Sequence, residues 1–297
     1  MSIIETSSLS RYYGQRRGID AVNLAVPEGT LFGFLGPNGA GKTTAIRVMV
    51  GLLRPSAGEA RIFGLDCWRQ SETIKHEVGY VPGDLRLHSW MNGLTALRIW
   101  GRIRRRNLIA PGRDLAERFN LDLTVKVRSM SRGMRQKLGL ILALVHKPRL
   151  LVLDEPTVTL DPLVQTIVQQ LLREMAAAGH TVFFSSHTLS EVEQLCDRVA
   201  MIRDGRLVAD ESLQQLRTRA GHQVTIRWRD ETAAAADPPP FLTLDQRNGP
   251  LWSGMLTGPV DQFVTWLAGR PIDDVSIGRP DLETLFGHYY APEEKGP

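Results

Sequence analysis

A glycine-rich segment near the N-terminus has the composition of a phosphate-binding loop. Residues 36–44 read GPNGAGKTT and fit the pattern G-x-x-x-x-G-K-[ST], after an apolar run and before a helical pattern. Glycines let backbone N–H groups converge on phosphate oxygens, and the helix N-terminus adds partial positive charge. We expect Lys42 to reach the β- and γ-phosphates and the Thr43 hydroxyl to bind Mg²⁺. The expected nucleotide-binding residues of this loop are Gly36, Pro37, Asn38, Gly39, Ala40, Gly41, Lys42, Thr43 and Thr44.

Two neighbouring carboxylates, Asp154 and Glu155, follow a second apolar run. Side chains alternate along an extended chain, so the two carboxylates diverge. We expect Asp154 to hold Mg²⁺, directly or through water, and Glu155 to polarise a water in line with the γ-phosphate. Together with the loop, the pair predicts phosphoryl transfer to water, a reaction in which positioning and charge neutralisation do most of the work.

Four short apolar runs must position these residues, and amphipathic helical patterns separate them. The runs are residues 31–35, 150–153, 181–185 and 198–202. This alternation predicts an α/β fold with a parallel sheet covered on both faces. In such a sheet, ligand groups gather at the carboxyl ends of the strands. Residues 92–147 read as mainly helical, which predicts a helical subdomain at about residues 88–147.

The composition changes after about Arg219. Val224, Ile226 and Trp228 alternate with polar residues, as in a half-exposed strand. Further strands are predicted at residues 251–256 and 272–277, helices at residues 260–268 and 280–288, and a flexible loop at residues 231–240. We therefore expect a large domain over residues 1–215 and a small α+β accessory domain over residues 220–297.

Net charge, hydropathy and cysteine spacing indicate where the chain works, but they do not select a binding partner. The 297 residues carry a net charge of +4, which permits nucleic acid or an anionic membrane surface and demands neither. No stretch approaches the ~18–20 apolar residues of a membrane span. The two cysteines, Cys67 and Cys196, lack CxxC spacing, which favours a reduced compartment. We expect a protein that does not itself cross a membrane.

With these motifs, residues 1–215 resemble the ATP-binding subunit of an ATP-binding cassette (ABC) transporter, a P-loop NTPase. Residues 36–44 look like the family's Walker A motif and residues 150–155 like its Walker B motif. The resemblance implies three catalytic residues, namely Glu155 as the catalytic glutamate, Lys42, and His187 as the switch histidine. It also implies that Tyr13 stacks on adenine, with Tyr12 as a competitor, and that Asp161 belongs to the D-loop.

Residues 129–137, SMSRGMRQK, fall where the family carries its signature, usually LSGGQ. The resemblance implies that Ser131 and Gly133 bind the γ-phosphate of a nucleotide held by the opposite subunit. Two ATP molecules would then be enclosed in a head-to-tail dimer, for which a homodimer is the expected form. Arg132 stands where the family usually has glycine.

One position departs from the family pattern. After residues 78–82, VGYVP, the family has a glutamine or glutamate, but this chain has Gly83. A glycine side chain can bind neither Mg²⁺ nor the attacking water, and Asp84 is a candidate substitute.

The resemblance further implies a separate membrane permease, since this chain has no spans. The form S-[KR]-G-M-[KR]-Q-K and the appended domain look like ATPase subunits of bacterial exporters, so we expect export of a drug, antibiotic or lipid-like compound. Residues 83–93 would form the groove for the permease, at the cytoplasmic face of the membrane. For Arg102 and residues 104–106, a solvated helix end is favoured over contact with lipid headgroups.

A soluble ABC-type ATPase acting on nucleic acid or the ribosome is the alternative. Such proteins carry long coiled-coil insertions, cysteine-rich zinc modules or two cassettes, and this chain has none of these. A GTPase would require an Asn-Lys-x-Asp element, which is also missing. No nucleic-acid partner is expected.

Overall fold

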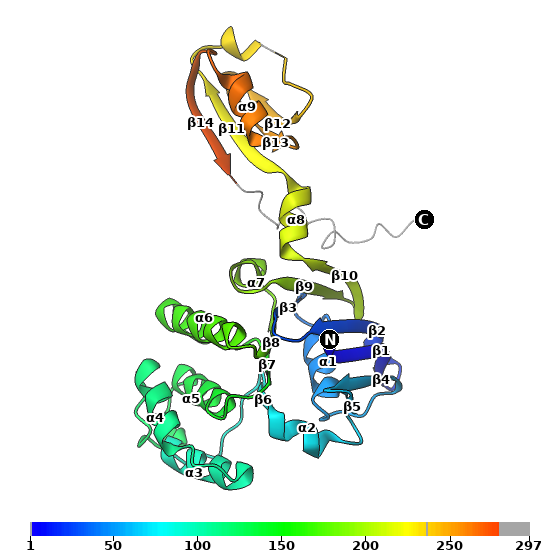
Figure 1. The fold of residues 1–297 in the computed structure, drawn as a ribbon, viewed down its shortest axis with the longest axis vertical. Coiled ribbons are helices and arrows are strands. Elements are labelled where there is room, and N and C mark those ends of the chain that lie inside the picture. Colours follow the sequence, from blue (N-terminus) through cyan, green and yellow to red (C-terminus); the bar gives the residue numbers. More distant parts are fainter. Residues whose placement is uncertain (1, 236, 279–297) are drawn as a thin grey trace. The chain divides into compact units, whose positions relative to one another are not determined.

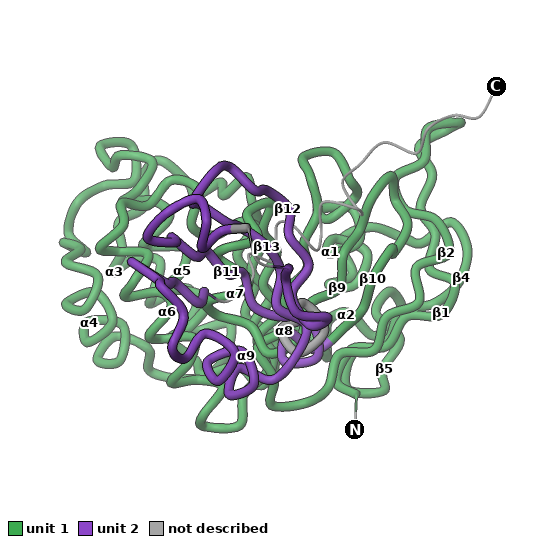
Figure 2. Tube along the Cα trace, turned by 90° about the horizontal axis from the view of Figure 1, so that it is seen from above, with its two compact units in different colours: residues 1–211 green, residues 212–297 purple. Residues whose placement is uncertain are grey.

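The computed structural model describes residues 2–235 and 237–278 (Figure 1). The chain divides into two units, Met1–Glu211 and a second that begins at Ser212, which Figure 2 distinguishes by colour. The helix expected at residues 280–288 lies outside the described residues.

A six-stranded sheet forms the centre of the first unit. Its spatial order is β10 (Arg206–Ser212), β9 (Arg198–Arg203), β3 (Leu31–Leu35), β8 (Thr181–Ser186), β7 (Leu150–Asp154) and β6 (Val78–Val81). The strands from β9 to β6 are parallel. All residues of β3, β7 and β8 are buried, as expected where both faces of a sheet are covered. The four strands expected from apolar runs are confirmed, and β6 was not among the predictions.

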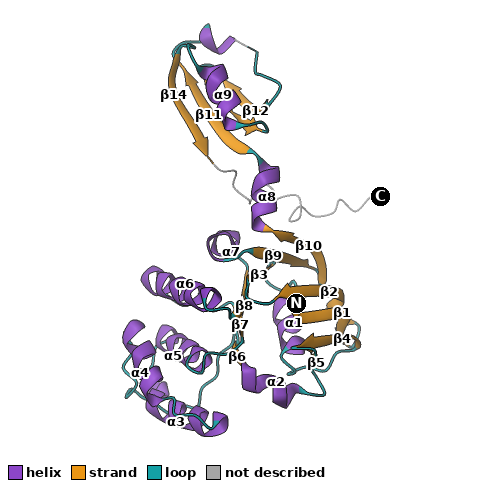
Figure 3. Ribbon diagram, viewed as in Figure 1, coloured by secondary structure: helices purple, strands orange, loops and turns teal. Residues whose placement is uncertain are grey.

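A second, antiparallel sheet belongs to the same unit. Its order is β2 (Arg16–Pro27), β1 (Ser2–Tyr13), β4 (Ala57–Ile62) and β5 (Leu65–Asp66). Helix α1 (Lys42–Met49) lies between the two sheets, as Figure 3 shows. Its buried Ile46 packs in one core with Ile4 and Ile62 of the antiparallel sheet and with Val152 of β7. The first helical residues after the phosphate loop are therefore anchored on both sides.

The remaining helices of this unit pack against the six-stranded sheet or against one another. They are α2 (Ser71–Glu77), α3 (Gly93–Arg104), α4 (Ile109–Arg118), α5 (Arg132–Leu144), α6 (Pro162–Ala177) and α7 (Leu189–Leu195), with a 3₁₀ turn at Val127–Ser129. The prediction that residues 92–147 are mainly helical is confirmed. Helix α5 approaches β6 so closely that a Cβ at Gly79 would lie 2.3 Å from the Ala143 carbonyl oxygen.

The second unit has its own four-stranded antiparallel sheet. The order is β12 (Leu242–Asn248), β13 (Leu251–Leu256), β11 (His222–Trp228) and β14 (Ile272–Gly278). Helices α8 (Leu213–Ala220) and α9 (Val260–Leu267) and a 3₁₀ turn at Ala233–Ala235 complete its described elements. Trp228, Trp252 and Phe263 are the largest side chains of its core. The strands predicted at residues 251–256 and 272–277 and the helix at residues 260–268 are confirmed.

Candidate active site

The glycine-rich loop joins β3 to α1 at the carboxyl edge of the parallel sheet. Gly41 precedes the helix with a φ of 110°, a value that L side chains rarely adopt. A Cβ at Gly41 would lie 2.6 Å from the Gly18 carbonyl oxygen, and one at Gly36 would lie 2.3 Å from that of Ile202. The close approach of these backbones therefore requires glycine at both positions.

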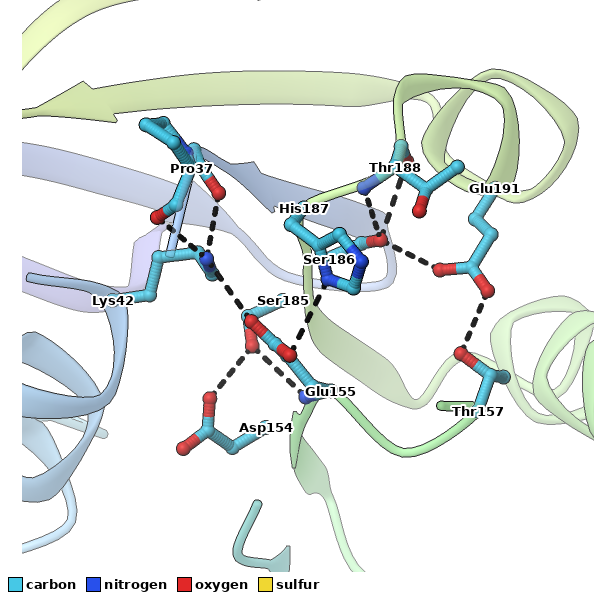
Figure 4. A network of polar contacts seen from close by, with 11 residues as sticks. Pro37, Lys42, Asp154, Glu155, Thr157, Ser185, Ser186, His187, Thr188 and Glu191 are labelled. Carbon is cyan, nitrogen blue, oxygen red and sulfur yellow. Dashed lines mark hydrogen bonds and ion pairs between the residues drawn. The ribbon is translucent and has the colours of Figure 1, made fainter. Parts of the chain in front are cut away.

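Lys42 is the first residue of α1, and its side chain is buried. Its Nζ donates to the carbonyl oxygens of Gly36 at 2.6 Å and Pro37 at 3.1 Å. The same nitrogen lies 3.0 Å from Glu155 Oε1, as Figure 4 shows. The loop thus curls around the ammonium group, and the ion pair links the start of α1 to the residue after β7.

Asp154 ends β7 and is completely buried. Its Oδ1 accepts a hydrogen bond of 2.9 Å from Ser185 Oγ on the neighbouring strand β8. Its Oδ2 is buried without a hydrogen-bond partner among the described residues. Burial and the charge of Asp154 raise the pKa of nearby Tyr80 to about 12, so this phenol stays neutral. One carboxylate oxygen is held in place while the other is left available for a ligand.

Glu155 follows with a φ of 49°, the left-handed conformation that few non-glycine residues adopt. Its backbone N–H points to both the carbonyl and the hydroxyl oxygen of Ser185, at 3.2 and 3.1 Å. Its Oε2 lies 3.4 Å from Nδ1 of His187, which follows β8 (Figure 4). Backbone strain of this kind costs about 1–3 kcal/mol and clusters at functional sites. The unusual turn directs the carboxylate of Glu155 to both Lys42 and His187.

A cleft of about 770 Å³ opens above these residues. The expected site residues that line it are Tyr13, Asn38, Gly39, Gly41, Lys42, Thr43, Thr44, Asp154 and Glu155. Gly36, Pro37, Ala40, His187, Ser131, Gly133 and Asp161 are not among its lining residues. The first four still belong to the cluster, because Gly36, Pro37 and Ala40 form the loop and His187 contacts Glu155.

Tyr13 and Tyr12 have different surroundings. Tyr13 lines the cleft and has the Arg11 guanidinium 5.1 Å from its ring centroid. A Cβ at Gly18 would lie 2.9 Å from its ring, so any larger residue at position 18 would displace the ring. Tyr12 donates its hydroxyl to Asp20 Oδ1 at 2.6 Å and is not a lining residue. Of the two tyrosines, only Tyr13 is in a position to meet a nucleotide base in this cleft.

Ser131 and Asp161 each precede a helix and cap it. Ser131 Oγ accepts from Met134 N at 3.1 Å at the start of α5, and Asp161 Oδ1 accepts from Val164 N at 3.0 Å at the start of α6. Both residues are exposed. A Cβ at Gly133 would lie 3.3 Å from the Thr159 carbonyl oxygen, so the two loops are neighbours. Arg132, between Ser131 and Gly133, lines the cleft.

Gly83 lies beside the buried carboxylate. A Cβ at this position would be 3.4 Å from Asp154 Oδ2, so a longer side chain here would face that oxygen. Asp84 also lines the cleft, but its exposed carboxylate is paired with Arg86 at 2.8 Å. Asp84 therefore does not occupy the space that glycine leaves.

Three cleft-lining arginines were missed by the sequence reasoning, namely Arg16, Arg17 and Arg47. Arg16 and Arg17 follow the turn after Tyr13, and Arg47 lies in the last turn of α1, whose first residue is Lys42. Their proximity in sequence to expected site residues was the available signal. They add positive charge to a cleft that already contains Lys42, as an anionic ligand requires.

Comparison with known proteins extends these observations. A family profile described as ABC transporter matches residues 19–158. The chain is 33% identical over 304 aligned positions to the daunorubicin resistance ATP-binding protein DrrA3 of Streptomyces coeruleorubidus, covering 96% of this chain and 95% of that protein. It is 37% identical over 240 positions to the bacitracin transport ATP-binding protein BcrA of Bacillus licheniformis, covering 78% of this chain and 77% of that protein.

Solved structures show the same fold. An ATP-binding subunit of an ABC transporter, 28% identical, aligns with a TM-score of 0.68 over 73% of this chain and 92% of its own. The dimeric ATP-binding cassette MJ0796 bound to ADP and Pi, 22% identical, has a TM-score of 0.63 and covers 71% of this chain and 98% of its own. This second likeness concerns the fold alone.

The nucleotide-binding fold defines a P-loop ATPase, and the chain belongs to the ABC transporter family as an ATP-hydrolysing, ATP-binding subunit. The resemblance and the α/β fold class inferred from the sequence are both confirmed. These relatives carry transport and resistance names, so the alternative of an ATPase acting on nucleic acid or the ribosome gains no support. Among the described residues, none of the helices has the length and hydrophobicity to span a bilayer.

Proposed function

We propose that this chain binds Mg-ATP in the cleft and hydrolyses it in a dimer that drives export through a separate membrane permease. The observation that carries the proposal is the convergence of Lys42, Asp154, Glu155 and His187 from the ends of three neighbouring strands. Lys42 and His187 both contact Glu155, and Asp154 is bound to the Ser185 hydroxyl that also accepts from the backbone N–H of Glu155.

Nucleotide binding is assigned to the loop and to the residues near it. The backbone N–H groups of residues 36–44 hold the phosphates, and Lys42 reaches the β- and γ-phosphates. Tyr13 stacks on the adenine, since aromatic side chains bind the π-face of a base. Arg16 and Arg17 lie close enough to this end of the cleft to add favourable charge.

The residues present fit a Mg²⁺ ion. Asp154 Oδ2 is a buried carboxylate oxygen without a hydrogen-bond partner among the described residues, and Thr43, which carries a hydroxyl group, lines the same cleft. Oxygen ligands of this kind are those that Mg²⁺ prefers. Asp154 and Thr43 would hold the ion, which when bound neutralises charge on the phosphate oxygens.

Hydrolysis is assigned to Glu155 and His187. Glu155 orients a water in line with the γ-phosphorus and accepts its proton as the new P–O bond forms and the bond to the bridging oxygen breaks. Lys42 stabilises the charge on the phosphate oxygens. His187, whose Nδ1 contacts Glu155 at 3.4 Å, contacts the γ-phosphate and fixes its place.

The dimer is assigned to the exposed loops around Ser131 and Asp161. Ser131 and Gly133 at the start of α5 would bind the γ-phosphate held by a second subunit, because a helix N-terminus attracts anions. Val158 and Leu163 near Asp161 are 59% and 79% exposed. Apolar side chains with this much exposure support a protein interface at this position.

The assignment of this chain to a transport process is supported by its similarity to relatives named for daunorubicin resistance and bacitracin transport. We infer that the cargo is a drug-like, antibiotic-like or lipid-like compound and that the chain works at the cytoplasmic face of the membrane. Residues 83–93 would receive the permease. Trp90 in this segment is 62% exposed, which suits a site for a protein partner.

The central test is ATP hydrolysis by the reconstituted complex of this chain with its permease, comparing wild type with Glu155→Gln. The variant keeps the size of the side chain but loses the proton acceptor, so kcat should fall about 100-fold or more. Glu174→Gln is the matched control, since Glu174 is paired with Arg118 away from the cleft. Full turnover in Glu155→Gln would refute the catalytic assignment.

A further inference from the structure

Glu191 connects two segments of the active site although it is not among the residues that line the cleft. It lies in the first turn of α7, just after His187. Its Oε2 accepts a hydrogen bond of 2.6 Å from Ser186 Oγ, and its Oε1 accepts one of 2.8 Å from Thr157 Oγ1 (Figure 4). One carboxylate therefore bridges the end of β8 and the loop that follows β7.

The first contact fixes the turn that carries His187. Ser186 is 2% exposed and immediately precedes the histidine. Its hydroxyl oxygen also accepts from Thr188 N at 2.9 Å, so the backbone on the far side of His187 bends back to the same atom. The Ser186 hydroxyl has two acceptors in range, Glu191 Oε2 at 2.6 Å and the Thr188 carbonyl oxygen at 3.2 Å, and the shorter contact joins the histidine turn to α7.

The second contact fixes the loop that carries Glu155. Thr157 is 3% exposed and lies two residues after the glutamate. Its carbonyl oxygen accepts from Leu160 N at 3.0 Å, which starts the turn toward Asp161. Gln136 of α5 donates to the carbonyl oxygen of the intervening Pro156 at 2.9 Å. The loop is thus held by α5 at one residue and by α7 at the next.

Glu191 suits this role better than a neutral side chain of the same length. Hydrogen bonds from hydroxyl groups to a carboxylate are shorter and roughly twice as strong as those between neutral groups. Both of its oxygens act as acceptors here, each for a hydroxyl on a different segment. Because those hydroxyl groups are buried, losing the acceptor leaves both without this partner.

We propose that Glu191 is a positioning residue that keeps His187 and Glu155 in register for ATP hydrolysis. It acts by tying Ser186, next to the histidine, to Thr157, near the glutamate. The inference rests on the proposed function, because it assumes that these two residues act on the γ-phosphate and the attacking water. A displacement of about 1 Å between such groups can lower a rate 100-fold.

The first test compares Glu191→Ala with Glu191→Gln in the purified full chain. Alanine removes both contacts, and kcat per nucleotide-binding site should fall about 10- to 100-fold while KM for ATP stays within about twofold. Glutamine can accept from one hydroxyl and donate to the other, so it should restore kcat to within about fivefold of wild type. A purely structural role would lower the folded fraction but not the turnover per binding site.

The second test removes each of the two hydrogen bonds to Glu191 separately, by Thr157→Val and Ser186→Ala. Each should lower kcat, and neither should lower it further in the Glu191→Ala background, because the bridge is already broken there. These small changes also keep the inference testable if Glu191→Ala does not fold. If Thr157→Val and Ser186→Ala each lowered kcat by the same factor with and without Glu191→Ala, the proposed bridge would be contradicted.

Gln194→Ala provides the control on the same helix, since Gln194 is exposed and contacts Gln169 at 3.4 Å rather than the cleft. It should keep wild-type kcat and KM. Normal kcat in Glu191→Ala would overturn the inference while leaving the proposed function intact. Absence of hydrolysis by the wild-type chain and its permease complex would instead contradict the proposed function.

Discussion

Tyr13 shows how a single residue in the cleft is prepared for its ligand. Its ring is held by the Arg11 guanidinium, 5.1 Å from the centroid, and by the close approach of Gly18. A ring fixed in this way loses little conformational entropy when a base stacks on it. Tyr12, directly before it, is instead bound to Asp20, which raises the pKa of the Tyr12 hydroxyl.

Replacing Tyr13 with alanine should weaken ATP binding by about 1–3 kcal/mol, the usual contribution of one stacked base, so the Kd should rise about 5- to 150-fold. The measurement is a titration with a fluorescent ATP analogue. Tyr12→Phe is the paired control, because it removes only the hydroxyl bound to Asp20. Equal losses in the two variants would show that the base does not stack on Tyr13.

The sequence predicts the residues that carry the chemistry better than those that hold them. Lys42, Asp154 and Glu155 belong to short motifs, so local spacing identifies them. Ser185 and Glu191 act through contacts across 31 and 34 positions of the chain. Such contacts depend on β7 and β8 lying side by side, which no local pattern encodes.

At the scale of elements, the arginines at the C-terminal end of α3 connect this helix to its neighbours. Arg104 donates to the carbonyl oxygens of Lys75, His76 and Val78, and Arg106 donates to that of His146. The prediction of a solvated helix end is therefore wrong for Arg104, which is partly buried, whereas Arg106 is exposed as predicted. They attach the end of α3 to α2, to β6 and to the turn that follows α5, which joins the helical region to the sheet.

His146 makes this junction sensitive to acid. Burial, together with the charge of Arg104, lowers the pKa of His146 to about 4, whereas in the unfolded chain it takes up a proton near its ordinary value. Stability should therefore fall as the pH drops from about 6.5 toward 4. Between pH 7 and 5 the loss from this residue should be about 2 kcal/mol, measured by urea denaturation.

His146→Leu should remove this part of the pH dependence, because leucine cannot take up a proton in the unfolded chain. His76→Leu, at an exposed histidine, is the control for replacing a histidine with leucine. An identical slope in wild type and His146→Leu would contradict the prediction.

The antiparallel sheet of the first unit was not predicted, and its strands explain why. Pairing of β1 with β2 shifts register between Ser2 and Ile4, between Thr6 and Leu9, and again before Arg11. The buried residues of β1 consequently include adjacent pairs, Ile3–Ile4 and Leu9–Ser10, rather than every second residue. A regular alternation is the signal of a half-buried strand, and each bulge breaks it.

At the scale of the whole molecule, the proposed dimer depends on exposed apolar residues beside Asp161. Leu163→Glu should raise the dissociation constant of the ATP-dependent dimer at least tenfold, because it places a carboxylate in the proposed interface. The measurement is light scattering after size-exclusion chromatography, with ATP and in a Glu155→Gln background that preserves the nucleotide.

Val208→Glu on β10 is the control for added charge, since Val208 is 38% exposed and does not line the cleft. ATP affinity of the separate subunits should be the same in both variants. Undiminished association of Leu163→Glu would place the interface elsewhere.

The strand that leads into the phosphate loop pairs with segments far along the chain. β3 lies between β8 and β9, so no partner strand exists until residues 181–186 have been synthesised. At ribosomal rates of about 5–20 residues per second, the nascent Leu31–Leu35 segment waits roughly 7–30 s for its neighbour. An apolar strand without a partner is prone to aggregate during this time. The chain can therefore bind ATP only after nearly the whole first unit has been synthesised and has folded.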